Sequence, residues 1–225
     1  MSVKANLAHV LEKLRQVADH AGRDVSEVSL VIVSKNHPFS EMKEAYDFGC
    51  RDFGESRLQE ALGKMQEAPS DIRWHFIGRL QKNKVSKVVG RFALIHSVDS
   101  YELAEKISQE SLQKNLVTQV LLQANTSREK SKGGLSREDW KRCFLQILEL
   151  GGIEVMGLMT MAPLTEEEAL IRHTFSELRQ LRRELESVGK VTLPTLSMGM
   201  SNDFRLAIEE GSTLVRIGSA IFAPT

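Results

Sequence analysis

The sequence predicts a single-domain α/β fold, a (β/α)8 TIM barrel with an extra N-terminal helix. Eight short β-rich runs alternate with helical patterns, and no linker or internal repeat divides the 225 residues, so we expect one domain over 1–225. A doubly wound open sheet is the competing fold. That fold usually has fewer strands and a glycine-rich turn after the first one, where this chain has Ser34-Lys35-Asn36-His37-Pro38.

The first element is a helix expected over residues 3–21, because its apolar residues recur at helical spacing. These residues are Leu7, Val10, Leu11, Leu14, Val17 and Ala18. The eight strands are expected in the apolar, β-branched runs 28–33, 51–53, 72–77, 93–97, 117–123, 153–159, 193–197 and 213–217.

The helices between the strands are predicted from polar or glycine start signals. The expected starts are Ser40 for 41–48, Glu55 for 55–66, Gly78 before 81–89, Asp99 or Ser100 for 101–114, Ser136 for 137–149, Thr165 for a long helix ending near Val188 with Gly189 as its C′ residue, and Ser201 or Asn202 for a short helix before Gly211.

Composition narrows the function classes. Lys+Arg and Asp+Glu both number 30, so no net charge attracts nucleic acid or an anionic membrane, and neither is an expected partner. No apolar run approaches the ~18 residues of a membrane span. Cys50 and Cys143 lack metal-ligand spacing and fall in expected helices, so we expect them to be small buried hydrophobes in a reducing compartment. We expect a cytoplasmic protein without a metal site.

The strand ends carry the polar residues, although the strand bodies are apolar. In a TIM barrel these ends meet at one face, where the chemistry sits. In chain order they are Ser34-Lys35-Asn36, Gly54-Glu55-Ser56, His75-Phe76-Ile77-Gly78, His96-Ser97-Val98-Asp99, Gln123-Ala124-Asn125, Met159-Thr160-Met161, Ser197-Met198-Gly199-Met200-Ser201 and Arg216-Ile217-Gly218-Ser219. Together they predict one polar pocket.

The last two strand ends point to phosphate. Glycine lets the backbone approach a ligand closely, free N–H groups at a helix start bind anions, and barrels often hold phosphate after strands 7 and 8. The alternative is that Ser201 is only an N-cap and Gly218 only a turn residue.

Lys35 follows an apolar run that should be buried. Its amine either reaches past apolar neighbours to solvent or enters the pocket, where it would be available for Schiff-base chemistry. A lysine and a phosphate cradle in one pocket suggest pyridoxal phosphate, or a class I aldolase acting on a phosphorylated sugar.

Several motifs in order resemble one known family. They are Val33-Ser34-Lys35, Phe53-Gly54-Glu55, Trp74-His75-Phe76-Ile77-Gly78, His96-Ser97-Val98-Asp99, Gly157-Leu158-Met159, Leu196-Ser197-Met198-Gly199-Met200-Ser201 with Asp203-Phe204, and Val215-Arg216-Ile217-Gly218. Between residues 7 and 222 the chain resembles the pyridoxal phosphate homeostasis proteins, the YggS/PROSC family. The aldolase hypothesis would leave these matches unexplained.

The resemblance implies a barrel similar to the N-terminal domain of alanine racemase, with pyridoxal 5′-phosphate as cofactor. Lys35 matches the lysine that forms the Schiff base, and Arg216 an arginine near the pyridine ring. The residues that match the phosphate loops are Ser197, Met198, Gly199, Met200, Ser201, Gly218 and Ser219. Ser56, where the family commonly has asparagine, and His75 complete the expected cofactor-binding set.

The resemblance also implies a carrier that serves pyridoxal phosphate homeostasis rather than a robust catalyst, with apoenzymes as candidate partners and a monomer or weak dimer as the expected state. Alanine racemase needs a tyrosine from a C-terminal β domain, for which 225 residues leave no room. Tyr46 is expected to pack inside a helix, and Tyr101 to lie near the pocket mouth. The alternative function is a weakly active racemase or lyase that uses the same cofactor.

Overall fold

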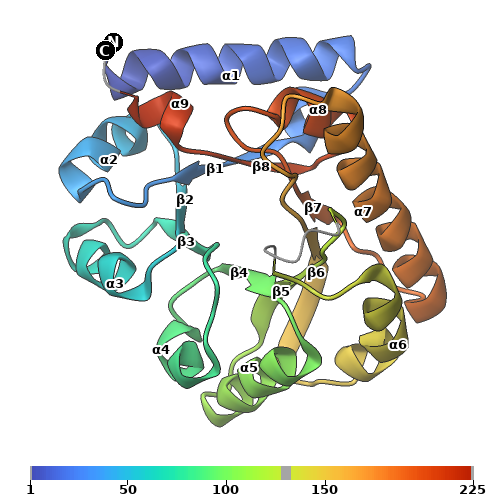
Figure 1. Cartoon of the computed structure of the whole chain (residues 1–225). Coiled ribbons are helices and arrows are strands. Elements are labelled where there is room, and N and C mark those ends of the chain that lie inside the picture. Colours follow the sequence, from blue (N-terminus) through green and yellow to red (C-terminus); the bar gives the residue numbers. More distant parts are fainter. Residues whose placement is uncertain (1, 128–132, 224–225) are drawn as a thin grey trace.

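The computed structural model describes residues 2–127 and 133–223. The described residues form eight parallel strands that close into a barrel, each paired with the next and the last with the first (Figure 1). The strands are β1 (Ser29–Val33), β2 (Asp52–Glu55), β3 (Arg73–Phe76), β4 (Leu94–Val98), β5 (Thr118–Gln123), β6 (Ile153–Met159), β7 (Thr195–Ser197) and β8 (Leu214–Ile217). The predicted fold class is confirmed.

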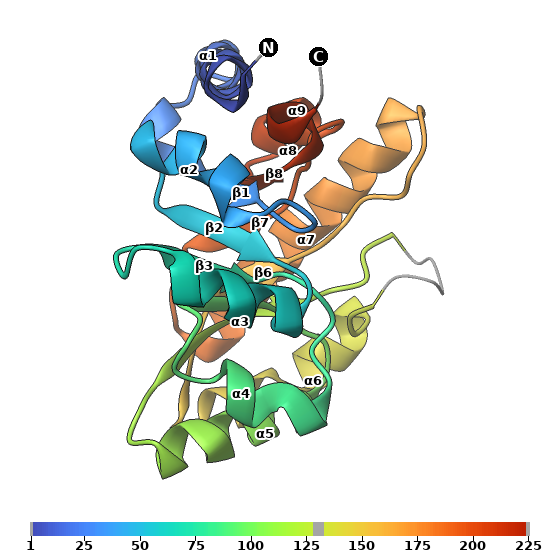
Figure 2. The ribbon, with the colours of Figure 1, turned by 90° about the vertical axis from the view of Figure 1, so that its left-hand side faces the viewer.

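Helices surround the barrel on the outside, as the two perpendicular views show (Figures 1 and 2). They are α1 (Val3–His20), α2 (Phe39–Asp47), α3 (Leu58–Glu67), α4 (Val85–Val88), α5 (Tyr101–Gln113), α6 (Arg137–Leu148), α7 (Glu168–Gly189), α8 (Phe204–Glu209) and α9 (Ser219–Phe222), with short 3-10 turns η1 (Val25–Glu27) and η2 (Lys82–Lys84). No helix among the described residues is long and apolar enough to cross a membrane.

The core has two parts, because successive strand residues face alternately the helices and the barrel interior. A large apolar layer lies between strands and helices. A small separate cluster consists of Val31, Leu94, Leu121, Met159 and Leu214. TIM-barrel interiors are mostly filled by such residues, but here much of the interior is polar, as described below.

The expected N-terminal helix is present as α1, which crosses α2, α8 and α9 (Figure 1). Ser2 caps it by accepting a hydrogen bond from the N–H of Ala5. Asn6 Nδ2 donates to the carbonyl oxygen of Ile221 at 3.0 Å. Helix α1 is therefore fastened to α9, the last helix of the barrel.

Two predicted helix caps are confirmed and others are wrong. Ser100 caps α5 and Ser136 caps α6. Helix α2 begins at Phe39, so Ser40 is its second residue. Helix α3 begins at Leu58 because Glu55 completes β2. The helix expected over 81–89 is the 3-10 turn η2 followed by the single turn α4.

The two remaining caps are displaced by competing contacts. Thr165 accepts from the N–H of Glu167 before α7 begins, and the left-handed residue after α7 is Lys190 rather than Gly189. Asp203 precedes α8, and its carboxylate accepts from the N–H of Met200. The Ser201 hydroxyl accepts instead from the N–H of Ala220, and no side chain, that of Asn202 included, caps α8.

Candidate functional site

Lys35 lies in a tight turn directly after β1, residues 34–37, which we call the lysine turn. The N–H of His37 donates to the carbonyl oxygen of Ser34 at 3.0 Å, and Asn36 adopts the left-handed conformation with φ of 66°. Asparagine tolerates this conformation better than most residues. The Lys35 side chain is exposed while Ser34 is buried. The chain has left the strand by Lys35, so its amine is presented at the barrel mouth without being buried.

Residues of β2 and α3 hold the lysine turn from the outside. Ser34 Oγ donates to Glu55 Oε1 at 2.6 Å. Lys64 Nζ donates to the same oxygen at 2.6 Å and to the Ser34 carbonyl oxygen at 2.7 Å. Glu60 accepts from the N–H of Asn36 at 3.2 Å. Because Glu55 is fully buried and the Lys64 side chain only 11% exposed, the ion pair is a rigid anchor for the turn.

The loops that follow β7 and β8 are joined to one another. The N–H of Ala220 donates to Ser201 Oγ at 3.3 Å, and the N–H of Arg216 donates to the carbonyl oxygen of Gly199 at 3.0 Å. Gly199 has φ of 97°, and a Cβ there would lie 2.6 Å from that of Ala207. Only glycine fits this position.

The end of β1 and the lysine turn contact the segment that follows β8. A Cβ on Gly218 would lie 2.6 Å from the carbonyl oxygen of Val33, so the two backbones approach as closely as glycine allows. The ring of His37 stacks on Phe222 of α9 with the ring centroids 4.2 Å apart. Lys35 and the two loops therefore belong to one continuous site.

Five backbone N–H groups in these loops donate no hydrogen bond within residues 2–127 and 133–223. They belong to Gly199, Ser201, Asn202, Gly218 and Ser219. Gly199 is buried and Ser201 and Gly218 are half-buried, where N–H groups are normally paired, while Asn202 and Ser219 are exposed. A cluster of free donors in two adjacent loops is suited to an anion with several acceptor oxygens.

A line of polar side chains crosses the barrel interior beneath these loops. His75 Nε2 lies 3.0 Å from Asp52 Oδ1, and His75 Nδ1 lies 2.9 Å from His96 Nε2. His96 Nδ1 lies 2.9 Å from Ser197 Oγ, which accepts a hydrogen bond from the guanidinium of Arg216. We call these five residues the interior chain. It runs from the first residue of β2 to the C-terminal half of β8.

Both ends of the interior chain are fixed by further bonds. Arg73, at the start of β3, donates from Nε to Asp52 at 2.7 Å. At the other end Arg216 donates to the carbonyl oxygen of Thr160 at 3.0 Å. The Thr160 hydroxyl in turn donates to the carbonyl oxygen of Ala124 at 2.9 Å.

Burial has the largest effect on the pKa values in the interior chain. Burial lowers the pKa of Arg216 to about 10, although the Asp203 carboxylate opposes the shift. Arg216 therefore stays cationic at neutral pH. Burial, with the nearby His75 and Arg216, lowers the pKa of His96 well below its usual value. Burial also works against ionisation of Asp52, but hydrogen bonds from His75 and Arg73 outweigh it and lower that pKa to about 2.

The structure separates the predicted site residues into groups. Gly218 lies against Val33, two residues before Lys35, and Ser201 is bonded to Ala220, which follows Ser219. The N–H of Met200 is engaged by Asp203 and its side chain is partly exposed.

The other predicted residues lie around or below the mouth. Met198 packs in the outer core. Ser197 and His75 are in the interior chain, where both ring nitrogens of His75 are already bonded. Ser56 is half-buried against Gly78, whose Cβ would lie 2.0 Å from the Ser56 carbonyl oxygen.

Some residues of the site were missed by the sequence patterns. Glu55, although noted at a strand end, and Lys64 gave no sign of pairing, because neither a strand-end carboxylate nor a helix lysine is unusual. Asp52 at a strand start would have suggested only solvent exposure. His96 was visible as a strand-end histidine, but its partner Ser197 lies 101 residues away in the sequence.

The two tyrosines occupy different environments. Tyr46 donates its hydroxyl to Asp71 at 2.9 Å, and the guanidinium of Arg51 lies over its ring. These partners lie at or just before the starts of β2 and β3, which places Tyr46 away from the mouth. Tyr101 is the first residue of α5 and packs partly buried against the outer core.

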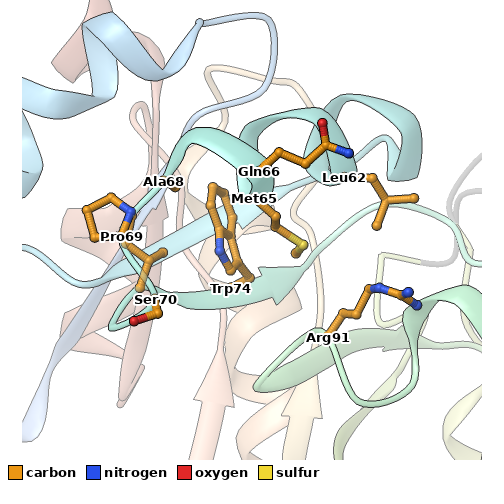
Figure 3. A pocket seen from close by; sticks show the side chains of 9 residues that line it. Leu62, Met65, Gln66, Ala68, Pro69, Ser70, Trp74 and Arg91 are labelled. Atoms are coloured by element: carbon orange, nitrogen blue, oxygen red, sulfur yellow. The ribbon is translucent and has the colours of Figure 1, made fainter.

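An open groove lies elsewhere on the molecule (Figure 3). It is lined by residues of α3, of β3 and of the loops before β3 and β4, among them Met65, Pro69, Trp74 and Arg91. This groove is near the N-terminal ends of the strands and does not include Lys35 or the two glycine loops.

The chain matches known proteins along its whole length. A family model described as alanine racemase, N-terminal domain, matches residues 5–225. The pyridoxal phosphate homeostasis protein of Aquifex aeolicus is 43% identical over 223 residues, which cover 99% of this chain and 98% of the relative. The corresponding protein of Pseudomonas aeruginosa is 40% identical over 222 residues, covering 98% and 95%. The chain belongs to the pyridoxal phosphate homeostasis protein family.

Solved structures agree with this membership, which the sequence motifs predicted. The family member PipY of Synechococcus elongatus, solved with pyridoxal phosphate bound, is 34% identical with a TM-score of 0.86, covering 99% of this chain and 100% of PipY. PipY without the cofactor gives a TM-score of 0.90 at 35% identity. An alanine racemase of Clostridium difficile is 13% identical with a TM-score of 0.75, covering 96% of this chain and 56% of the racemase, which shows a shared fold.

Proposed function

We propose that this member of the family binds pyridoxal 5′-phosphate as a Schiff base on Lys35 and contributes to intracellular pyridoxal phosphate homeostasis. The observation that carries the proposal is the contact of the β1 end and the lysine turn with the segment after β8, which belongs to two joined glycine loops with five free N–H groups. The PipY structure with bound cofactor supports the same ligand.

The residues present fit this group. When bound, pyridoxal phosphate supplies an aldehyde, which condenses with a primary amine with loss of water, and a phosphate dianion. The exposed Lys35 offers the amine, and the free N–H groups of the two loops offer donors for the phosphate oxygens. Arg216 stays cationic, and a cation near the pyridine nitrogen disfavours its protonation, which weakens the cofactor as an electron sink.

The test is chemical. Purified protein is mixed with pyridoxal phosphate, reduced with borohydride and digested, and the pyridoxyl-lysine peptide is identified. We expect the adduct on Lys35, its loss in Lys35→Ala, and no change in Lys84→Ala, a control at another strand-end loop. An adduct on a different lysine, or none in the wild-type protein, would contradict the proposal.

The same site supports a carrier more than a racemase. Of the two tyrosines, Tyr46 is engaged by Asp71 away from the mouth, and Tyr101 packs partly against the core. The exposure of Lys35 favours release of the cofactor to an acceptor such as an apoenzyme. Exchange of the α-proton of alanine or serine in deuterated water would instead favour the racemase or lyase function. Transfer of the cofactor to an added apoenzyme without such exchange is the result expected for a carrier.

A further inference from the structure

The interior chain connects the N-terminal rim of the barrel to Arg216, and its hydrogens can be assigned. Arg216 can only donate, so Ser197 Oγ is the acceptor in that bond. The hydroxyl hydrogen of Ser197 then has one acceptor among the described residues, the Nδ1 of His96. At the far end, the ionised Asp52 can only accept, so His75 Nε2 carries a hydrogen.

The direction of the hydrogen bond between His75 and His96 follows from the assignments at the two ends of the interior chain. His96 is unprotonated at Nδ1, and burial keeps it neutral, so its hydrogen lies on Nε2. That hydrogen points to His75 Nδ1, which is therefore the acceptor. Every hydroxyl and ring nitrogen in the chain then has one partner of the right kind. The reverse direction would leave the Ser197 hydrogen without an acceptor and add a second cation to an interior that already holds Arg216.

We propose that His96 and Ser197 are positioning residues for the cofactor site, and that the chain running back to Asp52 fixes the direction in which the Arg216 guanidinium points. The Ser197 hydroxyl, committed to His96, presents its lone pairs to Arg216. The carbonyl oxygen of Thr160 holds a second guanidinium nitrogen. With two of its nitrogens fixed, Arg216 cannot swing when a ligand enters or leaves.

The charged groups that bear on this chain come from four strands and one loop. Asp52 is on β2, Arg73 and His75 are on β3, His96 is on β4 and Arg216 is on β8, while Asp203 lies before α8. The carboxylates stand at the two ends, and the middle is neutral. The interior chain therefore fixes the orientation of Arg216 without placing a charge in the middle of the barrel.

The first test uses cofactor-free protein and needs no variant. With 15N-labelled histidine, the imidazole nitrogen shifts at pH 7 report which nitrogen carries the proton. We expect His96 and His75 both as neutral rings protonated at Nε2. A His96 protonated at Nδ1, or a doubly protonated His75, would overturn the assignment.

The second test distinguishes the loss of the hydrogen bond between residue 96 and Ser197 from a change in side-chain size. Asparagine at 96 places its amide where Nδ1 lies, whereas glutamine reaches toward Nε2. Because the proposed effect passes through Ser197, His96→Asn should retain cofactor affinity, and His96→Gln and Ser197→Ala should each raise the dissociation constant about tenfold. The control is His173→Gln, at an exposed position on α7.

The absorption maximum of the bound cofactor is a second readout, because it responds to the groups around the pyridine ring. We expect it to shift in His96→Gln and Ser197→Ala. Unchanged affinity and absorption in both variants would refute the positioning role. The inference rests on the proposed function. If wild-type protein binds no cofactor, the proposed function fails, and so does the role at the cofactor site, while the nitrogen shifts still decide the hydrogen-bond assignment.

Discussion

Lys64 Nζ lies 2.6 Å from Glu55 Oε1 and 2.7 Å from the carbonyl oxygen of Ser34, so one buried ion pair holds the start of the lysine turn. The second carboxylate oxygen, Oε2, has no hydrogen-bond partner among the described residues. Among the described residues, only Lys64 and the Ser34 hydroxyl therefore offset the cost of burying the Glu55 carboxylate.

Replacing Lys64 alone should be costly. Lys64→Met leaves the Glu55 carboxylate buried and unpaired, and the expected loss is roughly 3–5 kcal/mol in the free energy of unfolding. Urea unfolding at pH 7 measures it. The double variant Glu55→Gln/Lys64→Met removes both charges and should lose clearly less. Equal losses in the single and double variants would mean that the ion pair does not hold the turn.

Gly218→Ala should damage both stability and cofactor binding. The added Cβ would lie 2.6 Å from the Val33 carbonyl oxygen, so one of the two backbones must move. We expect a loss of roughly 1–3 kcal/mol in stability and weaker binding of pyridoxal phosphate, measured by urea unfolding and by titration. Gly63→Ala is the control, since nothing lies within 4 Å of its Cβ position on α3. A Gly218→Ala protein with wild-type affinity would argue against the close approach.

Ser201→Ala should loosen the connection between the two loops. It removes the acceptor for the N–H of Ala220, which costs about 1 kcal/mol in stability. Because the free N–H groups are no longer held in one arrangement, the affinity for pyridoxal phosphate should fall. Ser86→Ala, at an exposed position on α4, should change neither quantity. Identical titration curves for the two variants would count against a cradle made by both loops.

We expect the interior chain to make the protein less stable in acid. Burial of His96 lowers the pKa of its imidazole in the folded state. The stability that depends on neutral His96 is therefore complete above about pH 6.5 and is lost as the pH falls toward the pKa of His96 in the folded protein. Asp52, with a pKa of about 2 instead of 3.8, contributes roughly 2 kcal/mol that disappears only between about pH 4 and 2.

Urea unfolding at pH 7, 6 and 5 isolates the histidine contribution. Wild-type protein should lose stability across this range, and His96→Gln should show a shallower slope. The control His173→Gln should keep the wild-type slope. If His96→Gln also keeps it, His96 is not the group that takes up the proton.

Much of the fold was predictable because strand bodies, helix faces and strand ends have local patterns. All eight strands lie within two residues of their expected bounds, and Lys35, Gly199 and Gly218 each follow the C-terminal end of a strand. The helix starts at Ser40, Glu55, Thr165 and Ser201 were wrong. A polar residue near a helix start has several possible partners, and only the tertiary structure decides among them.

The interior chain could not be predicted in the same way. His75 and His96 were expected at strand ends facing the polar pocket, but their partners come from strands far apart in the sequence. Pairing across a closed barrel depends on strand tilt and register, which single-strand patterns do not specify. The exposure of Lys35 also depends on a turn that one left-handed asparagine, Asn36, creates.

The bond from Asn6 to the carbonyl oxygen of Ile221 joins residues 215 positions apart, and β8 closes the barrel against β1. During synthesis, the apolar face of α1 has no partner in α8 and α9 until those helices emerge from the ribosome. Contacts of such long sequence separation form late and slow the folding of a chain. The glycine loops after β7 and β8 are translated long after the lysine turn, so a nascent chain without them would have the Lys35 amine but no phosphate-binding loops. Cofactor capture would then begin only after translation of the last strand.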